Sequence, residues 1–299
     1  MGNRAPQALY QRTYEAMHLD RPLPEQFFLY IRQMARGDFG DSLVTSHPIR
    51  EDLLRFFPAS LELASFAILF GVLVGLPLGV LCARFNGRWP DHCGRVFSLT
   101  GHSIPVFWLG IVLLLLFYAK LGLVGGPGRL DPQYQYTMEA TTGLVLVDCL
   151  LARDADAFFN AVSHMILPVF LLGLIAMGSI ARMSRGFLLS QLRQEYVLVL
   201  RLKGLSLNQA LWRHVLPNSM GPILSVVMMT FAYLLEGAVL TETVFAWPGL
   251  GTYITNSLFA ADLPAVLVST LLIGAAYLTL NQLAESLQRL LDPRLRSRA

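Results

Sequence analysis

Charged residues are scarce in this sequence. Asp, Glu, Lys and Arg make up 14% of its 299 residues, whereas a soluble globular domain usually carries about 25%. The net charge of +3 is small, and no basic block interleaved with aromatic residues is present, which argues against a nucleic-acid-binding protein. Because the apolar residues gather in discrete runs, the composition predicts an integral membrane protein.

Metal-binding and catalytic motifs are also missing. The three cysteines, Cys82, Cys93 and Cys149, form no CxxC pair, and their odd number and wide spacing favour neither a disulfide framework nor a zinc site. The six histidines include no HExxH pattern, and no Ser, His and Asp constellation lines up in the apolar runs. We therefore expect no metal, no cofactor and no enzymatic activity on this chain.

A phosphate-binding loop is absent as well. Such a loop ends in Gly-Lys-Ser/Thr, where backbone N–H groups and the lysine hold the phosphates. The sequence has no Gly-Lys pair, and its glycine cluster at residues 125–128 is expected to be a turn. Any ATP hydrolysis linked to this protein must therefore take place on a partner subunit.

Five apolar segments are long enough, or nearly so, to cross a bilayer. A helix needs about 20 mostly apolar residues to cross roughly 30 Å of hydrocarbon. The segments are residues 61–83, 103–123, 165–181, 222–241 and 264–283. Residues 143–152 are too short and include Asp148, so they predict a surface or re-entrant helix. The predicted fold class is all-α, a polytopic bundle of about five transmembrane helices.

The positions of Lys and Arg orient these spans, because positive side chains are retained on the cytoplasmic side. The second loop is mostly acidic, and the fourth, residues 242–263, has neither Lys nor Arg. The other loops and the C-terminal segment carry Arg84, Arg88, Arg95, Arg182, Arg185, Arg193, Arg201, Lys203, Arg213, Arg289, Arg294, Arg296 and Arg298. This alternation predicts a cytoplasmic C-terminus, with residues 293–299 as a cytoplasmic tail.

Five spans with a cytoplasmic C-terminus place residues 1–57 outside the cytoplasm. This segment lacks the basic and apolar regions of a signal peptide. It predicts two amphipathic helices, residues 24–34 stopping at Gly37 and residues 49–57 stopping at Pro58, which lie on the outer membrane surface or cap the bundle. We expect an upstream span to be absent from this chain, and the transmembrane domain to comprise residues 58–292.

Two features within the spans suggest specific roles. Gly71, Gly75 and Gly79 recur every fourth residue on one face of the first span, which predicts close packing of a neighbouring helix. Glu236 lies in the fourth span, where a carboxylate is costly unless it faces water or a partner. It either lines the translocation path and contacts a substrate amine, or is an ordinary buried or interfacial carboxylate.

A turn is predicted directly after the fourth span, at Trp247, Pro248 and Gly249. Proline followed by glycine fits the two central positions of a type II turn, and the tryptophan suits an interfacial anchor. We expect this segment to fold back as a turn and a short helix at the outer mouth.

Residues 182–218, between the third and fourth spans, are the most informative stretch. A helical run is expected to end at Gly204, which suits the left-handed cap position. Ser206 can cap the next helix, with Gln209 completing a capping box, and that helix is expected to end at Pro217. Two short helices joined by a forced bend make a rigid protrusion that can transmit force from a soluble partner. A long basic loop without such a role is the simpler alternative.

This stretch resembles the cytoplasmic signature loop of binding-protein-dependent ABC importer permeases, and is similar to the peptide/nickel branch of that family. The resemblance rests on Glu195, Tyr196, Val197, Arg201, Lys203, Gly204, Leu205, Ser206, His214, Leu216, Pro217 and Asn218. Further matching segments lie at residues 19–24, 36–40, 103–108, 242–249 and 291–294. The sequence departs from the family at Leu200 and Leu202, where relatives usually have small residues, and lacks the first of six spans.

The resemblance implies a multi-pass permease subunit of the bacterial inner membrane that forms the path for di- or oligopeptides, or nickel in some relatives. Two homologous permeases would pair around a central path, and two cytoplasmic ATP-binding subunits would drive them. A periplasmic solute-binding protein would deliver the substrate. Residues 195–206 would be the coupling helix and its bend, and residues 214–218 would anchor it to the fourth span.

The alternative is a secondary transporter or channel driven by an ion gradient. Such proteins typically carry several intramembrane charges and broken helices near the midplane. Glu236 is the only candidate of this kind in the sequence, and this alternative leaves the cytoplasmic loop without a role.

Overall fold

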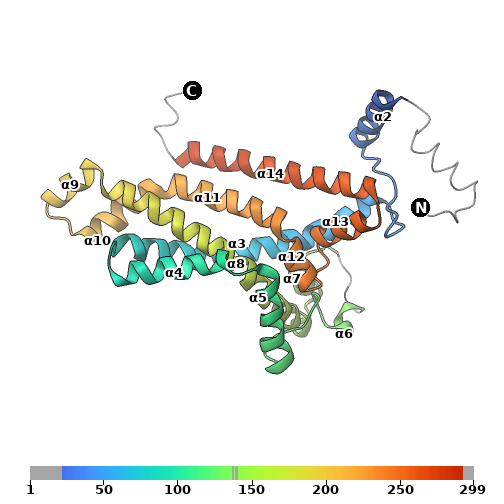
Figure 1. The fold of residues 1–299 in the computed structure, drawn as a ribbon, viewed down its shortest axis with the longest axis horizontal. Helices are drawn as coiled ribbons and strands as arrows, with labels where there is room; N and C mark the ends of the chain where they lie inside the picture. Colours follow the sequence, from blue (N-terminus) through green and yellow to red (C-terminus); the bar gives the residue numbers. More distant parts are fainter. Residues whose placement is uncertain (1–21, 137, 139–140, 292–299) are drawn as a thin grey trace, which may run out of the picture.

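The structure, a computed structural model, describes residues 22–136, 138 and 141–291, and its regular elements are helices (Figure 1). Within these ranges the only strand-like pairing is an isolated antiparallel bridge between Asp41 and Pro48. The predicted all-α fold is therefore confirmed for the described residues. The predicted cytoplasmic tail, residues 293–299, lies outside them, as do residues 1–21 of the predicted N-terminal segment.

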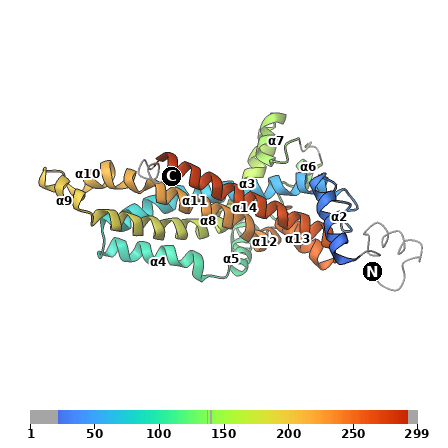
Figure 2. The same ribbon diagram turned by 90° about the horizontal axis from the view of Figure 1, so that it is seen from above.

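Four helices of the described part are long and apolar enough to cross a membrane, by length and composition. They run side by side in both views (Figures 1 and 2). The first, third, fourth and fifth predicted spans correspond to them, and α8 is the most enclosed. The four are α3 (Ile49–Arg84), α8 (Ala155–Leu192), the continuous helix Leu207–Gly237 that ends in α11 (Leu216–Gly237), and α14 (Leu263–Leu291).

The predicted second span, residues 103–123, differs from this pattern. Pro105 separates α4 (Trp89–Ser103) from α5 (Val106–Leu113), because proline has no N–H and disfavours helical backbone at the residue before it. The apolar helix Val106–Lys120 consists of α5 and the π-helix η1 (Leu114–Lys120). It is about 22 Å long at 1.5 Å per residue, which is short of the roughly 30 Å hydrocarbon core. In Figure 1, α5 turns away from the direction of α4.

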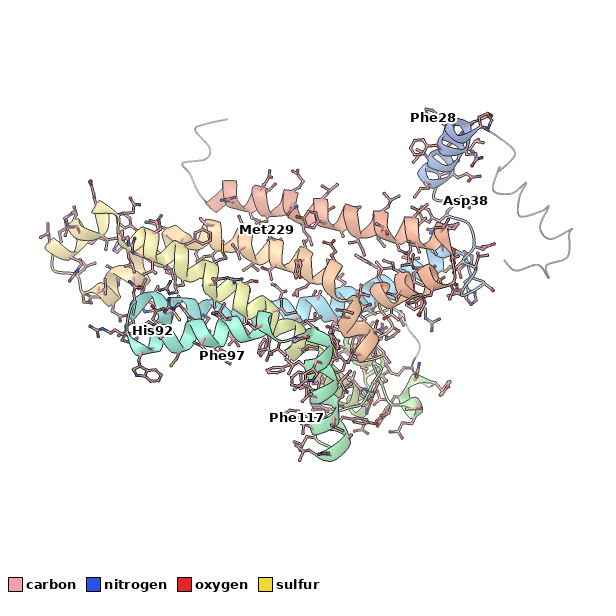
Figure 3. All side chains as sticks on the ribbon, in the orientation of Figure 1. Phe28, Asp38, His92, Phe97, Phe117 and Met229 are labelled. Carbon is pink, nitrogen blue, oxygen red and sulfur yellow. The ribbon has the colours of Figure 1, made fainter. Side chains whose placement is uncertain are left out.

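The first predicted amphipathic helix is present as α2 (Leu23–Ala35). It ends shortly before Gly37, which has a φ of 77°. Phe28, labelled in Figure 3, is exposed, whereas Met34 packs against the apolar cluster formed by α3, α13 (Leu250–Phe259) and α14. The apolar face of α2 is therefore only partly covered by the described residues.

The predicted helix end at Pro58 is wrong, because α3 continues through this proline to Arg84. Pro58 cannot donate to the carbonyl of Leu54, a loss that a membrane helix tolerates where neighbouring protein packs against it. The loop at Gly143 lies there: a Cβ added at Gly143 would meet the Pro58 ring at 3.1 Å and the Leu54 carbonyl oxygen at 3.5 Å. The start of α3 is not on the membrane surface, since Ile49 is fully buried against α13 and α14.

Helices α3 and α8 form the closest pair in the bundle, as the glycine pattern of the first span predicts. Gly71, Gly75 and Gly79 all face α8. A Cβ at Gly75 would lie 2.7 Å from the Met177 carbonyl oxygen, and one at Gly79 would lie 2.8 Å from that of Ala181. Because lipid supplies no hydrophobic drive between helices, such close backbone contact is what holds them together.

Gly75→Ala is expected to destabilise the protein. The new methyl group would overlap backbone rather than a movable side chain, so the two helices must separate, at a cost of about 1–3 kcal/mol. The measurement is the thermal unfolding midpoint of the detergent-purified chain. Gly186→Ala in α8, where an added Cβ meets nothing within 4 Å, is the control. Equal midpoints for the two variants would contradict the close-packing account.

Candidate functional site

A bent helical hairpin projects from one end of the bundle, between α8 and α11 (Figures 1 and 2). Its first arm is α9 (Glu195–Leu202), and its second arm is α10 (Leu207–Ala210) followed by the π-helix η2 (Leu211–Val215). Gly204 has a φ of 91° at the bend, and a Cβ there would meet nothing within 4 Å. Glycine is therefore needed for its backbone conformation rather than for space, which confirms the predicted bend.

The second arm begins with the predicted capping box. The Ser206 hydroxyl accepts from the backbone N–H of Gln209 at 3.2 Å, and the Gln209 side-chain oxygen accepts from the Ser206 N–H at 2.9 Å. This reciprocal pair satisfies two N–H groups that the first turn of a helix leaves without partners. The bend and the start of the second arm are thus both fixed locally.

The predicted end of the second arm at Pro217 is wrong. Leu207–Gly237 is continuous, and Pro217 lies in the first turn of α11. Proline is tolerated there because the π-helical turn η2, directly before it, already departs from the regular i→i−4 hydrogen bonding that a proline would interrupt. The hairpin is therefore joined to α11 by helix rather than by a loop.

The hairpin is packed onto the bundle along its inner side. Val197 of α9 and Leu211 and Val215 of η2 are buried in one cluster with Val80 of α3 and Leu188 of α8. Tyr196 also donates its hydroxyl to the side-chain oxygen of Gln191 at 3.1 Å. The hairpin is therefore held by buried contacts with α3 and α8 and by the continuous helix into α11.

The outer side of the hairpin carries apolar side chains that are exposed in the single chain. We call the exposed Leu198, Val199, Leu202 and Trp212 the hairpin patch. The remaining residues that the sequence singled out here fall into two groups. The exposed ones are Glu195, Arg201, Lys203, Ser206, Pro217 and Asn218, and the half-buried ones are Leu205, His214 and Leu216. Sequence reasoning missed Leu198, Val199 and Trp212, although the spacing of the apolar residues on α9 places Leu198 and Leu202 on one face.

At the other end of the bundle, Trp247 is not an interfacial anchor. Its side chain is fully buried, and its indole N–H donates to the Ala59 carbonyl oxygen at 3.0 Å. The predicted type II turn is also wrong, because Gly249 has φ −103° and that turn needs a positive φ there. The Gly249 N–H instead donates to the Trp247 carbonyl across Pro248 at 2.8 Å. The expected short helix does follow, as α13.

A buried carboxylate that sequence reasoning did not single out holds this turn against α3. Glu242 of α12 (Val239–Val244) accepts from the Ser60 hydroxyl and from the Thr252 N–H, the latter at 2.9 Å. Ser60 also accepts from the Leu250 N–H at 2.8 Å. Burial raises the pKa of the Glu242 carboxyl, an effect that these donors oppose. No local pattern could have predicted a partner so far away along the chain.

A second buried carboxylate, Glu62 of α3, fixes the neighbouring loops. Arg129 donates to Glu62, and its guanidinium lies 5.5 Å from the centre of the Trp247 ring. Glu62 also accepts from the N–H groups of Val145 and Leu146 at the start of α7 (Val145–Ala152), at 3.1 and 2.9 Å. The end of the bundle opposite the hairpin is therefore held together by buried polar contacts between α3, α7 and the neighbouring loops.

Glu236, the predicted path residue, lies in the last turn of α11 and is exposed in the single chain. Met229, labelled in Figure 3, and Tyr233 are also exposed, at 55% and 58%. The three occupy positions i, i+4 and i+7, so they share one face of the helix. We call this face the α11 stripe. Within the described chain Glu236 is therefore not an ordinary buried carboxylate.

Comparison with known proteins identifies the family to which this chain is similar. Residues 75–297 match the family described as "Binding-protein-dependent transport system inner membrane component". The chain is 40% identical, over 98% of its length and 86% of the relative's, to a probable D,D-dipeptide transport system permease protein of Escherichia coli. It is also 40% identical to a di/tripeptide transport system permease protein of Pseudomonas aeruginosa, over 96% of this chain and 85% of that one.

Solved structures show the same fold at low sequence identity. The MetNI methionine ABC transporter in an inward-facing conformation has a chain with a TM-score of 0.60 and 16% identity, covering 81% of this chain and 97% of its own. An amino acid ABC transporter gives a TM-score of 0.54 with 13% identity, over 80% of this chain and 94% of its own. Because residues 75–297 match the family and the relatives are 40% identical over nearly the whole chain, the chain belongs to the family of binding-protein-dependent transport system inner membrane components.

Proposed function

We propose that this chain is the permease subunit of an ATP-driven importer and forms part of the path by which di- or oligopeptides cross the membrane. Its partners would be a second, homologous permease, two cytoplasmic ATP-binding subunits and a periplasmic solute-binding protein. The observation that carries the proposal is the hairpin, which is seated firmly on its inner side and apolar on its outer side. The names of the peptide permease relatives support the substrate class.

The hairpin has the two properties that a coupling element needs. The exposed hairpin patch offers apolar side chains to a groove on an ATP-binding subunit, and exposed apolar groups that gather in one place mark interaction sites. The buried contacts of Val197 and Val215 join the hairpin to α3 and α8. Closure of the ATP-binding subunits would therefore move the helices rather than bend a loop.

The arrangement of the helix ends supports the predicted orientation. The hairpin, the turn between α3 and α4, and the end of α14 lie at the same end of the bundle (Figure 1). The described arginines of the first two predicted cytoplasmic segments, such as Arg84 at the end of α3 and Arg201 in α9, fall at this end, which agrees with the retention of positive charge on the cytoplasmic side. We therefore propose that this end and the C-terminus are cytoplasmic and that α2, α12 and α13 are periplasmic.

The α11 stripe is our candidate for the lining of the path. In the most apolar stretch of the helix Leu207–Gly237, 28% of the residues are buried by the rest of the chain, compared with 67% in that of α8. This surface is thus available to a second permease and to the path between the two. A peptide carries an ammonium group at its N-terminus, which a carboxylate such as Glu236 can bind with a charge-assisted hydrogen bond.

Gly204→Val is expected to uncouple the permease from its ATP-binding subunits. A β-branched residue in the left-handed region costs at least about 1–2 kcal/mol, so the bend must change and the hairpin patch with it. The measurement is the amount of ATP-binding subunit that co-purifies with the permease, together with ATP-dependent peptide uptake. We expect a large loss of both.

The matched control for this test is Gly122→Val. Gly122 also has a positive φ, 59°, and nothing within 4 Å of an added Cβ, but it lies in the loop after η1, away from the hairpin. We expect the control to keep its ATP-binding subunits. If both variants retain the ATPase and transport equally, the hairpin is not the coupling element.

Glu236→Gln is expected to lower peptide uptake by about tenfold, which corresponds to the loss of one charge-assisted interaction. Complex assembly and the thermal midpoint should stay unchanged, because Glu236 is exposed in the single chain. The measurement is ATP-dependent uptake of a labelled dipeptide into vesicles that hold the complete transporter. Glu51→Gln, an exposed carboxylate at the same end of the bundle, is the control. Undiminished uptake by Glu236→Gln would remove this residue from the path.

A further inference from the structure

A cavity of about 440 Å³ opens beside the hairpin, where the turn between α3 and α4 meets the end of α8 and the start of α10. Its volume lies in the range of roughly 300–1,000 Å³ that small-ligand sites occupy. The family motifs and the coupling role leave this cavity without a function. Its lining has two chemically different parts, which together indicate what it holds.

The polar part of the lining is cationic. Arg84, Arg88 and Arg193 border the cavity, and none of its lining residues is acidic. Arg84 lies at the end of α3 and Arg193 at the end of α8. Each helix end contributes only about half a negative charge, so three formal positive charges are incompletely neutralised. The Arg84 guanidinium stacks on the Phe85 ring, 4.9 Å from its centre, which orients its N–H groups without occupying them.

A carboxylate in the first turn of α4 does not neutralise this cluster. Asp91 is buried, and its oxygens accept from Arg185 at 2.7 and 2.8 Å and from the Gly87 N–H at 2.9 Å. The Arg185 hydrogen bonds hold the pKa of Asp91 at about 2, against the effect of burial. Asp91 therefore stays ionised and committed to Arg185, and the cavity arginines remain available to an external anion.

The second part of the lining is apolar. Leu189 and Leu192 of α8 and Leu207 of α10 border the same cavity. A free anion gains nothing from such surface, whereas an amphiphile with an anionic head can contact both parts. The combination of a cationic rim and an apolar wall matches a phospholipid headgroup and the first carbons of its acyl chains.

An exposed tryptophan next to the cavity supports a position near the membrane–water interface. Trp89, which directly follows Arg88, is 74% exposed, and exposed tryptophan is enriched at the membrane–water interface. Arg88 is the last residue of the turn between α3 and α4, and Trp89 begins α4, at the end of the bundle that carries the basic loops. Basic pockets between membrane helices on the cytoplasmic side are suited to acidic headgroups.

We propose that this cavity binds an anionic phospholipid of the cytoplasmic leaflet, with its phosphate on Arg84, Arg88 and Arg193 and its acyl chains along the leucines. The bound lipid joins the α3–α4 turn to the start of the second hairpin arm. The inference rests on the proposed orientation of the chain but not on its partners or its substrate.

The test is native mass spectrometry of the detergent-purified chain titrated with phosphatidylglycerol. We expect Arg84→Gln, Arg88→Gln and Arg193→Gln each to weaken binding about fivefold, since each removes one charge close to the headgroup. The corresponding Arg→Lys variants should retain most of the binding, which shows that loss in the Gln variants does not reflect misfolding. Phosphatidylcholine, which has no net charge, should bind much more weakly than phosphatidylglycerol.

The control is Arg182→Gln, an exposed arginine of α8 that does not border the cavity, and it should bind phosphatidylglycerol normally. Equal weakening by Arg182→Gln, unchanged binding in the three cavity variants, or equal binding of phosphatidylcholine would each overturn the proposal. Displacement of the lipid by millimolar inorganic phosphate would assign the site to free anions instead. A second measurement uses the assembled transporter. If the three cavity variants lose their ATP-binding subunits there while lipid binding to the purified chain is unchanged, the arginines belong to a protein interface and the lipid site is overturned.

Discussion

The close contact between α3 and α8 is the constraint on which both ends of the molecule depend. Gly71, Gly75 and Gly79 let the two backbones approach to distances that no side chain would permit. At one end α3 then presents Ser60 and Glu62 to the turn at Trp247 and to α7. At the other end, α3 and α8 together form the apolar seat of the hairpin. If this contact loosened, the hairpin would lose its apolar support on α3 and α8.

The hairpin combines local and long-range determinants. Its shape comes from two short-range rules, the positive φ of Gly204 and the capping box of Ser206. Its stiffness comes from burial of Val197 and Val215 against the bundle and from an unbroken helix into α11. A loop selected only for positive charge needs neither of these features, so the packed hairpin favours coupling over the simpler alternative of a long basic loop.

The features that could be predicted from the sequence are those set by local chemistry. The glycine stripe, the bend at Gly204, the capping box and the four long apolar helices follow from spacing and residue type alone. The wrong predictions concern residues whose surroundings simple local patterns do not encode. Pro58 and Pro217 are predicted as helix ends, but both helices continue past them. A neighbouring loop packs against Pro58, and a π-helical turn directly precedes the first turn of α11, which contains Pro217. Trp247 was read as exposed because its partner, the carbonyl of Ala59, lies far away in the chain.

The central claim is that an ATP-binding subunit binds the hairpin, and cross-linking tests it most directly. A photoactivatable group attached to Leu202→Cys, in a Cys93→Ser background that leaves only the two buried native cysteines, reports what contacts the tip of α9 in the assembled transporter. The account predicts a cross-link to the ATP-binding subunit and none from Phe259→Cys, an equally exposed position at the opposite end. Failure of the Leu202→Cys probe to reach that subunit in an intact, ATP-hydrolysing complex would contradict it.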